Sequence, residues 1–352
     1  MHVHGGNVYR ASRQQGRAPD EFIDFSANIN PLGPSPRAVE AIKSHLHLIR
    51  HYPDPDSIEL TEELARYLQV EPDNIVVGNG AAELIPLVTE LVAPRRGIVF
   101  SPTFAEYSVA VERVGAQVIR VPYERAQTQD IDGDVLFLCN PNNPTGELMS
   151  KERVQALVRR AESRGTMCVI DEAFIDFVDE PEAYSLRFDA VKRSDLVVLG
   201  SLTKFFAIPG LRVGYVVAAP DLVEKLRRIK APWSVNCLAQ VAAVASLQDR
   251  RYIADTRTYV AEARQALVAG LNELAERYGF QVWPASANFV FISLARTGPT
   301  AAELARHLAA SGVLVRDCGN FPLLDQYSLR VAVRKTEENE RLLSELARVL
   351  ER

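Results

Sequence analysis

Residues 196–214 read LVVLGSLTKFFAIPGLRVG. The first four residues form an apolar run of strand length, and Ser201 and Lys204 follow it at once. Arg212 comes eight residues after the lysine. A lone lysine is usually a solvated surface charge, but ligands of open α/β sheets bind in the loops that follow the strands. The stretch therefore indicates a ligand site at the end of this strand.

Four further apolar runs precede this stretch, and amphipathic helical patterns such as residues 151–163 separate several of them. The runs are rich in β-branched residues, which favours strands. This alternation predicts an α/β fold with a mostly parallel sheet and helices on both of its faces. The four runs cover residues 75–77, 97–100, 135–138 and 167–170.

The last third of the chain has a different pattern, which predicts a smaller α+β domain. The first 45 residues contain three prolines within residues 31–36, and they are too short to form a domain alone. We therefore predict a large domain over residues 46–234 and a small domain made of residues 1–45 and 235–352. The elements predicted after residue 234 are a long helical stretch at 235–278, a strand at 289–292, a helix at 300–310, a strand at 328–333 and a final amphipathic helix.

The composition narrows the classes of function. The 352 residues carry a net charge of only −5, and the sequence has no run or cluster of basic residues of the kind that binds along a phosphate backbone. Both observations argue against nucleic-acid binding. The first residues lack the charged and apolar regions of a signal peptide, and no apolar run approaches the roughly 20 residues that span a bilayer. Cys139, Cys168, Cys237 and Cys318 are widely spaced, as expected for reduced thiols of a cytoplasmic protein, and no metal site is predicted.

Three other segments accompany the lysine stretch: residues 140–146 (NPNNPTG), residues 171–174 (DEAF) and the glycines on either side of Arg212. Each alone has an ordinary explanation, such as a turn or a helix N-cap. Their joint order and spacing resemble the class I and II aminotransferase branch of the fold-type-I enzymes, which depend on pyridoxal 5′-phosphate (PLP). The resemblance covers nearly the whole chain and implies the fold of that family.

The resemblance also implies roles at the cofactor. Lys204 would hold the PLP aldehyde as a Schiff base and later act as the local acid and base. Asp171 would keep the proton on the pyridine nitrogen, so that the ring can accept electrons. Asn143 would donate a hydrogen bond to the phenolic oxygen. Lys204 and Asp171 are thus the predicted catalytic residues.

The cofactor phosphate is expected at residues 78–83 (GNGAAE), a glycine-rich turn that opens a helix and can bind an anion. By resemblance, Tyr52 reaches the phosphate in the neighbouring subunit, which implies a homodimer with shared active sites. Relatives often have a tyrosine where this chain has Phe174, so that hydroxyl role does not carry over. The remaining predicted cofactor contacts are Gly80, Ala81, Ala82, Ser201, Thr203 and Arg212 around the phosphate, and Phe104 stacked on the ring, where plain core packing explains Phe104 nearly as well.

The PLP core does not determine the reaction, because the bond held perpendicular to the cofactor plane is the one that breaks. Segments outside the core resemble the decarboxylase branch, whose substrate is L-threonine O-3-phosphate and whose product serves cobalamin synthesis. Histidinol-phosphate aminotransferases are close cousins that usually lack the HGGN start, and L-serine phosphate is an alternative substrate. The segments are residues 4–7 (HGGN), 24–33, 231–236 and 327–334.

A phosphorylated amino acid has two anionic ends, which call for two sets of donors. By resemblance Arg330 would bind the carboxylate, with Arg334 and His4 near the substrate phosphate, although Arg316 and Arg334 also suit surface ion pairs. A PLP-binding regulator without turnover is the competing class, but no basic segment for a DNA-binding module is present. The predicted substrate contacts are His4, Gly5, Gly6, Asn30, Asn143, Arg316, Arg330 and Arg334.

Overall fold

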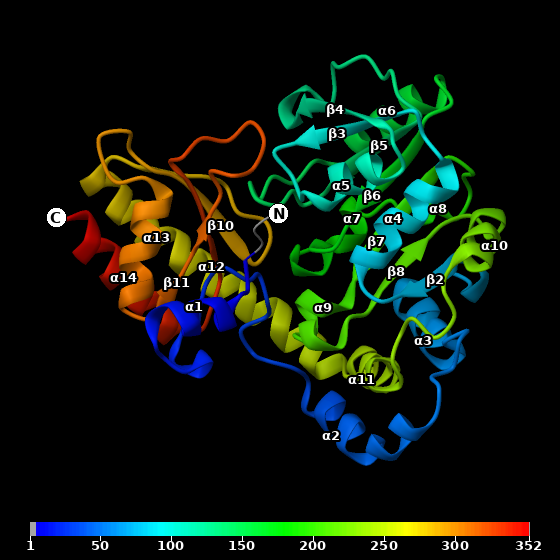
Figure 1. Cartoon of the computed structure of the whole chain (residues 1–352), viewed down its shortest axis with the longest axis horizontal. Helices are drawn as coiled ribbons and strands as arrows, with labels where there is room; N and C mark the ends of the chain where they lie inside the picture. Colours follow the sequence, from blue (N-terminus) through cyan, green and yellow to red (C-terminus); the bar gives the residue numbers. More distant parts are fainter. Residues whose placement is uncertain (1–4, 352) are drawn as a thin grey trace.

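The computed structural model describes residues 5–351. Two parts stand side by side in Figure 1, one built on a large sheet and one on a small sheet. Helix α12 (Arg250–Tyr278) connects them. Its first half contributes Tyr252 and Val260 to the core of the large sheet, whereas Leu267 and Leu271 belong to the core of the small one. The two parts are therefore joined by one continuous helix.

The large sheet has seven strands in the order β2-β8-β7-β6-β5-β3-β4. β8 runs antiparallel to both of its neighbours, and the strands from β7 to β4 are parallel. Most of their residues are buried, as expected for a sheet covered on both faces. The strands are β2 (Ile75–Gly78), β3 (Arg96–Ser101), β4 (Gln117–Pro122), β5 (Val135–Cys139), β6 (Met167–Asp171), β7 (Leu196–Ser201) and β8 (Gly214–Val217).

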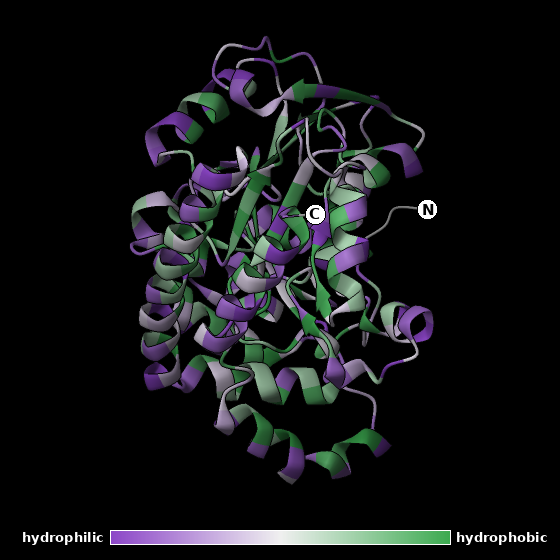
Figure 2. Ribbon diagram, turned by 90° about the vertical axis from the view of Figure 1, so that its left-hand side faces the viewer, coloured by the Kyte–Doolittle hydropathy of each residue, from purple (hydrophilic) through white to green (hydrophobic). Residues whose placement is uncertain are grey.

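Helices cover both faces of this sheet, and Figure 2 shows hydrophobic strands between amphipathic helices. One face packs against α4 (Ala81–Val92), α5 (Glu106–Arg113) and α10 (Pro220–Ile229). The other packs against α3 (Ile58–Leu68), α6 (Lys151–Glu162), α8 (Arg187–Ala190), α9 (Leu202–Phe205) and α11 (Cys237–Gln248). The predicted fold class, an α/β sheet flanked by helices, is confirmed.

The smaller part holds a four-stranded antiparallel sheet in the order β12-β13-β10-β9. A separate pair, β1 with β11, ties the N-terminal segment to this part. Two of its helices, α13 and α14, share a core with the second half of α12. Its elements are α1 (Val8–Gln15), β1 (Ile23–Asp24), β9 (Gln281–Val282), β10 (Phe289–Ser293), α13 (Ala301–Ala310), β11 (Val313–Leu314), β12 (Arg316–Asp317), β13 (Ser328–Ala332) and α14 (Thr336–Leu350).

Three details differ from the sequence prediction. The helical stretch at 235–278 is two helices, because Asp249 ends α11 and caps α12 by accepting a hydrogen bond from the Tyr252 amide at 3.2 Å. Strand β4 was missed, although residues 117–121 (QVIRV) mix polar and apolar residues as an edge strand does. Helix α2 (Pro36–Ser44) packs on α11, so not all of the first 45 residues lie beside the small sheet. The predicted domain boundaries stay a prediction.

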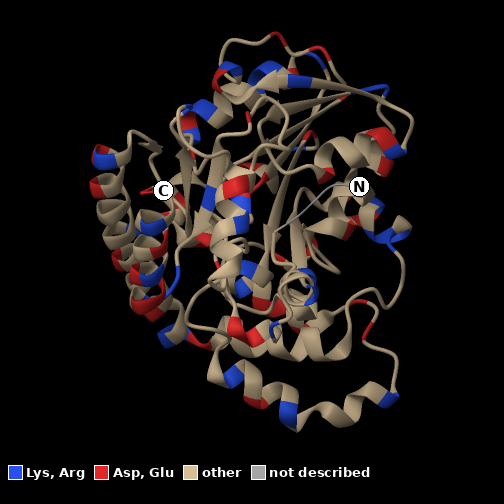
Figure 3. Ribbon diagram, turned by 60° about the vertical axis from the view of Figure 1, so that its left-hand side comes forward, with Lys and Arg blue, Asp and Glu red and all other residues tan. Residues whose placement is uncertain are grey.

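In the view of Figure 3, positive and negative residues are mixed over the ribbon. None of the helices formed by residues 5–351 is both long and apolar enough to cross a membrane.

Candidate active site

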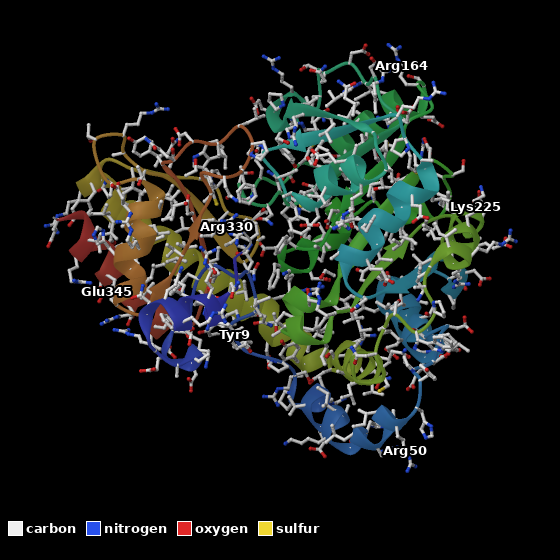
Figure 4. All side chains as sticks on the ribbon, in the orientation of Figure 1. Tyr9, Arg50, Arg164, Lys225, Arg330 and Glu345 are labelled. Carbon is white, nitrogen blue, oxygen red and sulfur yellow. The ribbon has the colours of Figure 1, made fainter. Side chains whose placement is uncertain are left out.

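A cavity of about 360 Å³ opens where the carboxyl ends of β5, β6 and β7 meet the small sheet. Parallel strands end at one edge, so side chains that follow each strand converge there. The sequence predicted this convergence for Asn143, Asp171 and Lys204, and all three line the cavity. Arg316 and Arg330 reach it from the small sheet. Figure 4 labels Arg330 between the two parts of the molecule.

Asp171 is the last residue of β6, between Cys139 of β5 and Leu199 of β7 in the register of the sheet. Its side chain is only 4% exposed, and burial raises its pKa, because a charge is costly away from water. One carboxylate oxygen accepts a hydrogen bond from the Tyr107 hydroxyl at 2.6 Å and the other from the Ala173 amide at 2.9 Å. A buried carboxylate of this kind is suited to binding a cationic group of a ligand.

Lys204 lies in the short helix α9, directly after β7. Burial lowers the pKa of Lys204 to about 8, and the positive charges of Arg212 and Arg330 act in the same direction. Within residues 5–351, its amine makes no hydrogen bond. A buried amine with a lowered pKa is partly neutral near pH 8, and the neutral form is the nucleophile that attacks an aldehyde.

The N-terminus of α4 forms an anion cradle beside the lysine. Gly80 has a φ of +76°, a backbone conformation that favours glycine, and the Arg212 guanidinium lies close to it: a Cβ at this position would lie 2.9 Å from Nη2 of Arg212. No side chain caps the helix, which leaves the first-turn amides of Ala81 and Ala82 for a ligand. Thr203, hydrogen-bonded to Ser201 at 2.8 Å, lines the same cavity.

Asn143 and Arg330 are linked across the two parts. Arg330 donates one hydrogen bond to the Asn143 carbonyl oxygen and another to the backbone oxygen of Ser26 at 2.7 Å. Since the carbonyl of Asn143 is thus engaged, its amide nitrogen remains to donate to a ligand. The Arg330 guanidinium lies over the ring of Phe289 at 5.4 Å. These contacts hold the guanidinium in a defined place at the cavity wall.

Arg316 faces Arg330 directly, because the two are paired across β12 and β13. Its guanidinium donates to the Asp317 backbone oxygen at 2.6 Å and to the Asn320 side chain at 2.8 Å. It also lies over the Phe321 ring at 5.0 Å. Two buried arginines therefore line one wall of the cavity.

Three predicted substrate contacts, Asn30, Arg334 and Gly6, do not line the cavity. The Asn30 amide donates to the Phe205 backbone oxygen at 2.8 Å and to the side chains of Tyr252 and Thr256, so it is occupied in joining the N-terminal segment to α9 and α12. Arg334 instead pairs with Glu338 one helical turn ahead, at 3.0 Å. For these three residues the geometry does not agree with the sequence prediction.

The remaining predicted residues lie in the N-terminal part of the chain: His4, Gly5, Gly6 and Tyr52. Gly5 lines the cavity, where a Cβ would collide with the Ser26 oxygen at 2.1 Å, and the neighbouring Gly6 amide donates to the Ser26 hydroxyl at 2.8 Å. His4 lies outside the described residues. Tyr52 is 80% exposed, stacks on Trp233 and does not line the cavity.

Two phenylalanines add apolar surface to the cavity. Phe104 lines it and meets Tyr107 edge to face at 5.7 Å, whereas Phe174 packs on Phe289 at 5.1 Å.

Sequence reasoning missed Tyr107, and it passed over Ser26 although the segment 24–33 had been singled out. The position of Tyr107, three residues after Phe104 at a helix start, was the available signal.

These groups fit a flat ligand that carries an aldehyde, a protonated ring nitrogen and a phosphate. The aldehyde suits Lys204, the ring cation suits Asp171, and the phosphate suits the α4 cradle with Arg212. PLP has all three features.

Comparison with known proteins agrees with this geometry. The family model "Aminotransferase class I and II" matches residues 20–346. The chain is 38% identical to threonine-phosphate decarboxylase of Salmonella typhimurium, over 99% of this chain and 96% of that protein. Two similar solved structures are histidinol-phosphate aminotransferase from Clostridium acetobutylicum (TM-score 0.84, 30% identity, 93% of this chain and 98% of that one) and L-threonine-O-3-phosphate decarboxylase from Porphyromonas gingivalis (TM-score 0.82, 29% identity, 93% and 99%).

The chain belongs to the class I and II aminotransferase family. It is a PLP-dependent enzyme, as the sequence motifs predicted. The resemblance to the decarboxylase branch is also confirmed. Because the chain is similar to both decarboxylases and aminotransferases, its reaction is inferred from the residues of the active site.

The lowered pKa of Lys204 predicts the pH at which the free protein reacts with its cofactor. Protonated amine does not attack an aldehyde, so the rate of covalent PLP attachment should rise with pH and reach half its maximum near pH 8. Mixing cofactor-free protein with PLP and following the absorbance between pH 6 and 11 measures this midpoint. A midpoint near 10.5, the ordinary value for lysine, would contradict the burial of this amine.

Proposed function

We propose that this enzyme decarboxylates L-threonine O-3-phosphate, giving (R)-1-amino-2-propanol O-phosphate and carbon dioxide for the nucleotide loop of cobalamin. The observation that carries the proposal is the pair of arginines, Arg316 and Arg330, which face each other across β12 and β13 and both line the cavity. A phosphorylated amino acid has two anionic ends, and two fixed guanidinium groups suit them. The 38% identity to the Salmonella typhimurium decarboxylase over nearly the full length supports the same reaction.

Arg330 is the better candidate for the substrate carboxylate. It already donates to Asn143, a residue expected at the cofactor ring, so a carboxylate bound to it lies near the reacting carbon. Arg316 then takes the phosphate, and the backbone of Gly5 lines the same cavity. This assignment replaces Arg334, whose ion pair with Glu338 holds it elsewhere.

Bound PLP supplies an electron sink for the pair of electrons that remains on the substrate Cα when its carboxylate leaves. Asp171 keeps a proton at the ring nitrogen, since its buried charge is best compensated by a cation there. Arg330 orients the carboxylate so that the bond from Cα to this group is the one that breaks. Lys204, in its protonated ammonium form, then donates a proton to Cα.

A second subunit is also proposed. Tyr52 and Trp233 stack at 4.8 Å and are 80% and 47% exposed, and other large apolar side chains are exposed in the same stretch of the chain. An exposed apolar surface of this kind is typical of a subunit interface. A homodimer that covers it would bring Tyr52 toward the phosphate of the partner's cofactor. The neighbouring exposed residues are Leu46, Ile49 and Ile58.

Incubation of the PLP-loaded enzyme with L-threonine O-3-phosphate tests the reaction. Carbon dioxide should be released without any added 2-oxo acid, because decarboxylation needs no amino acceptor. Parallel assays with L-serine O-phosphate, which lacks the methyl group of the threonine compound, measure the discrimination between the two substrates. One methyl group contributes only ~1–3 kcal/mol to such discrimination. Turnover of histidinol phosphate that depends strictly on 2-oxoglutarate would instead make the enzyme an aminotransferase.

The substitution Arg316→Leu tests the assignment of the phosphate. Loss of a charged hydrogen-bond donor costs about 1.5–3 kcal/mol, so KM for threonine phosphate should rise roughly 10- to 100-fold. The affinity for PLP should not change, because Arg316 belongs to β12 of the small sheet, whereas the α4 cradle belongs to the large part. Arg334→Leu serves as the comparison and should change KM by less than about twofold. The reverse pattern would restore Arg334 as the phosphate ligand.

A further inference from the structure

Tyr107 contacts Asp171, one of the two predicted catalytic residues. It is the second residue of α5 and is completely buried. Its ring stacks nearly parallel on Phe137 of β5, with 5.2 Å between centroids, and meets Phe104 edge to face. Its hydroxyl lies 2.6 Å from Oδ2 of Asp171. The ring is therefore held on two sides, and the hydroxyl points at the carboxylate.

The direction of this hydrogen bond is defined. Burial and the charge of Asp171 hold the pKa of Tyr107 well above its ordinary value, so the hydroxyl keeps its proton and donates. The Asp171 carboxylate accepts this bond on one oxygen and the Ala173 amide on the other. Both bonds favour the ionised form of Asp171, against the effect of burial.

Through competition for one proton, this hydroxyl can change the chemistry of the cofactor ring. A buried carboxylate and a ring nitrogen share a proton, and the stronger base takes it. A carboxylate that accepts two hydrogen bonds is a weaker base than one that accepts a single bond. With the hydroxyl in place, the proton stays on the ring and the ring stays cationic. Without it, Asp171 competes better, and the ring becomes a poorer electron sink.

We propose that Tyr107 is a positioning residue that acts through Asp171 and keeps the shared proton on the cofactor ring. The inference rests on the proposed role of Asp171 toward PLP, but it does not depend on which amino acid is the substrate. Tyr107 also supports Phe104, so only a change that keeps the aromatic ring isolates the hydroxyl. Tyr107→Phe is such a change.

Tyr123 provides a matched control. It too is buried, and its hydroxyl donates a single hydrogen bond, to the Cys139 backbone oxygen at 3.1 Å. It belongs to the core on the opposite face of the sheet and does not line the cavity. Tyr123→Phe therefore removes one buried hydroxyl without touching Asp171. A purely structural role for Tyr107 predicts the same behaviour for both variants.

The test uses the PLP-loaded enzyme and two measurements. A pH titration of the cofactor absorbance reports the proton on the nitrogen that joins Lys204 to the cofactor, and a cationic ring lowers the pKa of that nitrogen. Tyr107→Phe should move the midpoint upward by about one pH unit and lower kcat for carbon dioxide release roughly 10-fold, with KM nearly unchanged. Tyr123→Phe should leave both values as in the unmodified enzyme.

An unchanged titration midpoint in Tyr107→Phe, or an equal shift in Tyr123→Phe, would overturn the proposal. The titration needs no substrate, so it separates this inference from the proposed function. If threonine phosphate is not decarboxylated but the midpoint still moves only in Tyr107→Phe, the positioning role stands while the assigned reaction fails.

Discussion

The burial of two ionisable groups at one sheet edge is the constraint on which this site depends. Asp171 is almost fully removed from water, and the amine of Lys204 has a pKa lowered by the same effect. An isolated buried charge costs several kcal/mol, so such groups persist only where a partner compensates them. The Tyr107 hydroxyl and the Ala173 amide compensate part of the Asp171 charge, and a cofactor with a ring cation and an aldehyde would complete this environment.

The sheet explains why these groups meet. β6 and β7 are adjacent and parallel, so Asp171 at the end of one lies near Lys204 just beyond the other. The reversed strand β8 brings Gly214 beside Ser201, and Arg212 just before it comes within reach of Gly80 in the α4 cradle. The small sheet then closes the cavity with two arginines. The cofactor groups thus come from the large sheet and the substrate donors mainly from the small one, a division that permits a change of substrate without a change of cofactor chemistry.

Sequence reasoning predicted the cofactor end of the site better than the substrate end. Lys204, Asp171 and Asn143 follow strands whose apolar runs are easily recognised, so their convergence follows from the parallel sheet. The roles of Asn30 and Arg334 could not be predicted from strand patterns, because a polar residue in a loop can bind a ligand or hold the structure together. Asn30 does the latter through its hydrogen bonds to α9 and α12. Tyr107 was missed because its partner lies 64 positions away in sequence, and only the fold brings the two together.

Reductive trapping of the cofactor measures directly whether the buried amine at position 204 is the one that binds it. PLP is added to the pure protein, the covalent linkage is reduced with borohydride, and peptide mass spectrometry locates the modified lysine. The modification should fall on Lys204, and the variant Lys204→Ala should show neither the modification nor the yellow absorbance. Modification spread over exposed lysines, equal in the variant, would contradict the account.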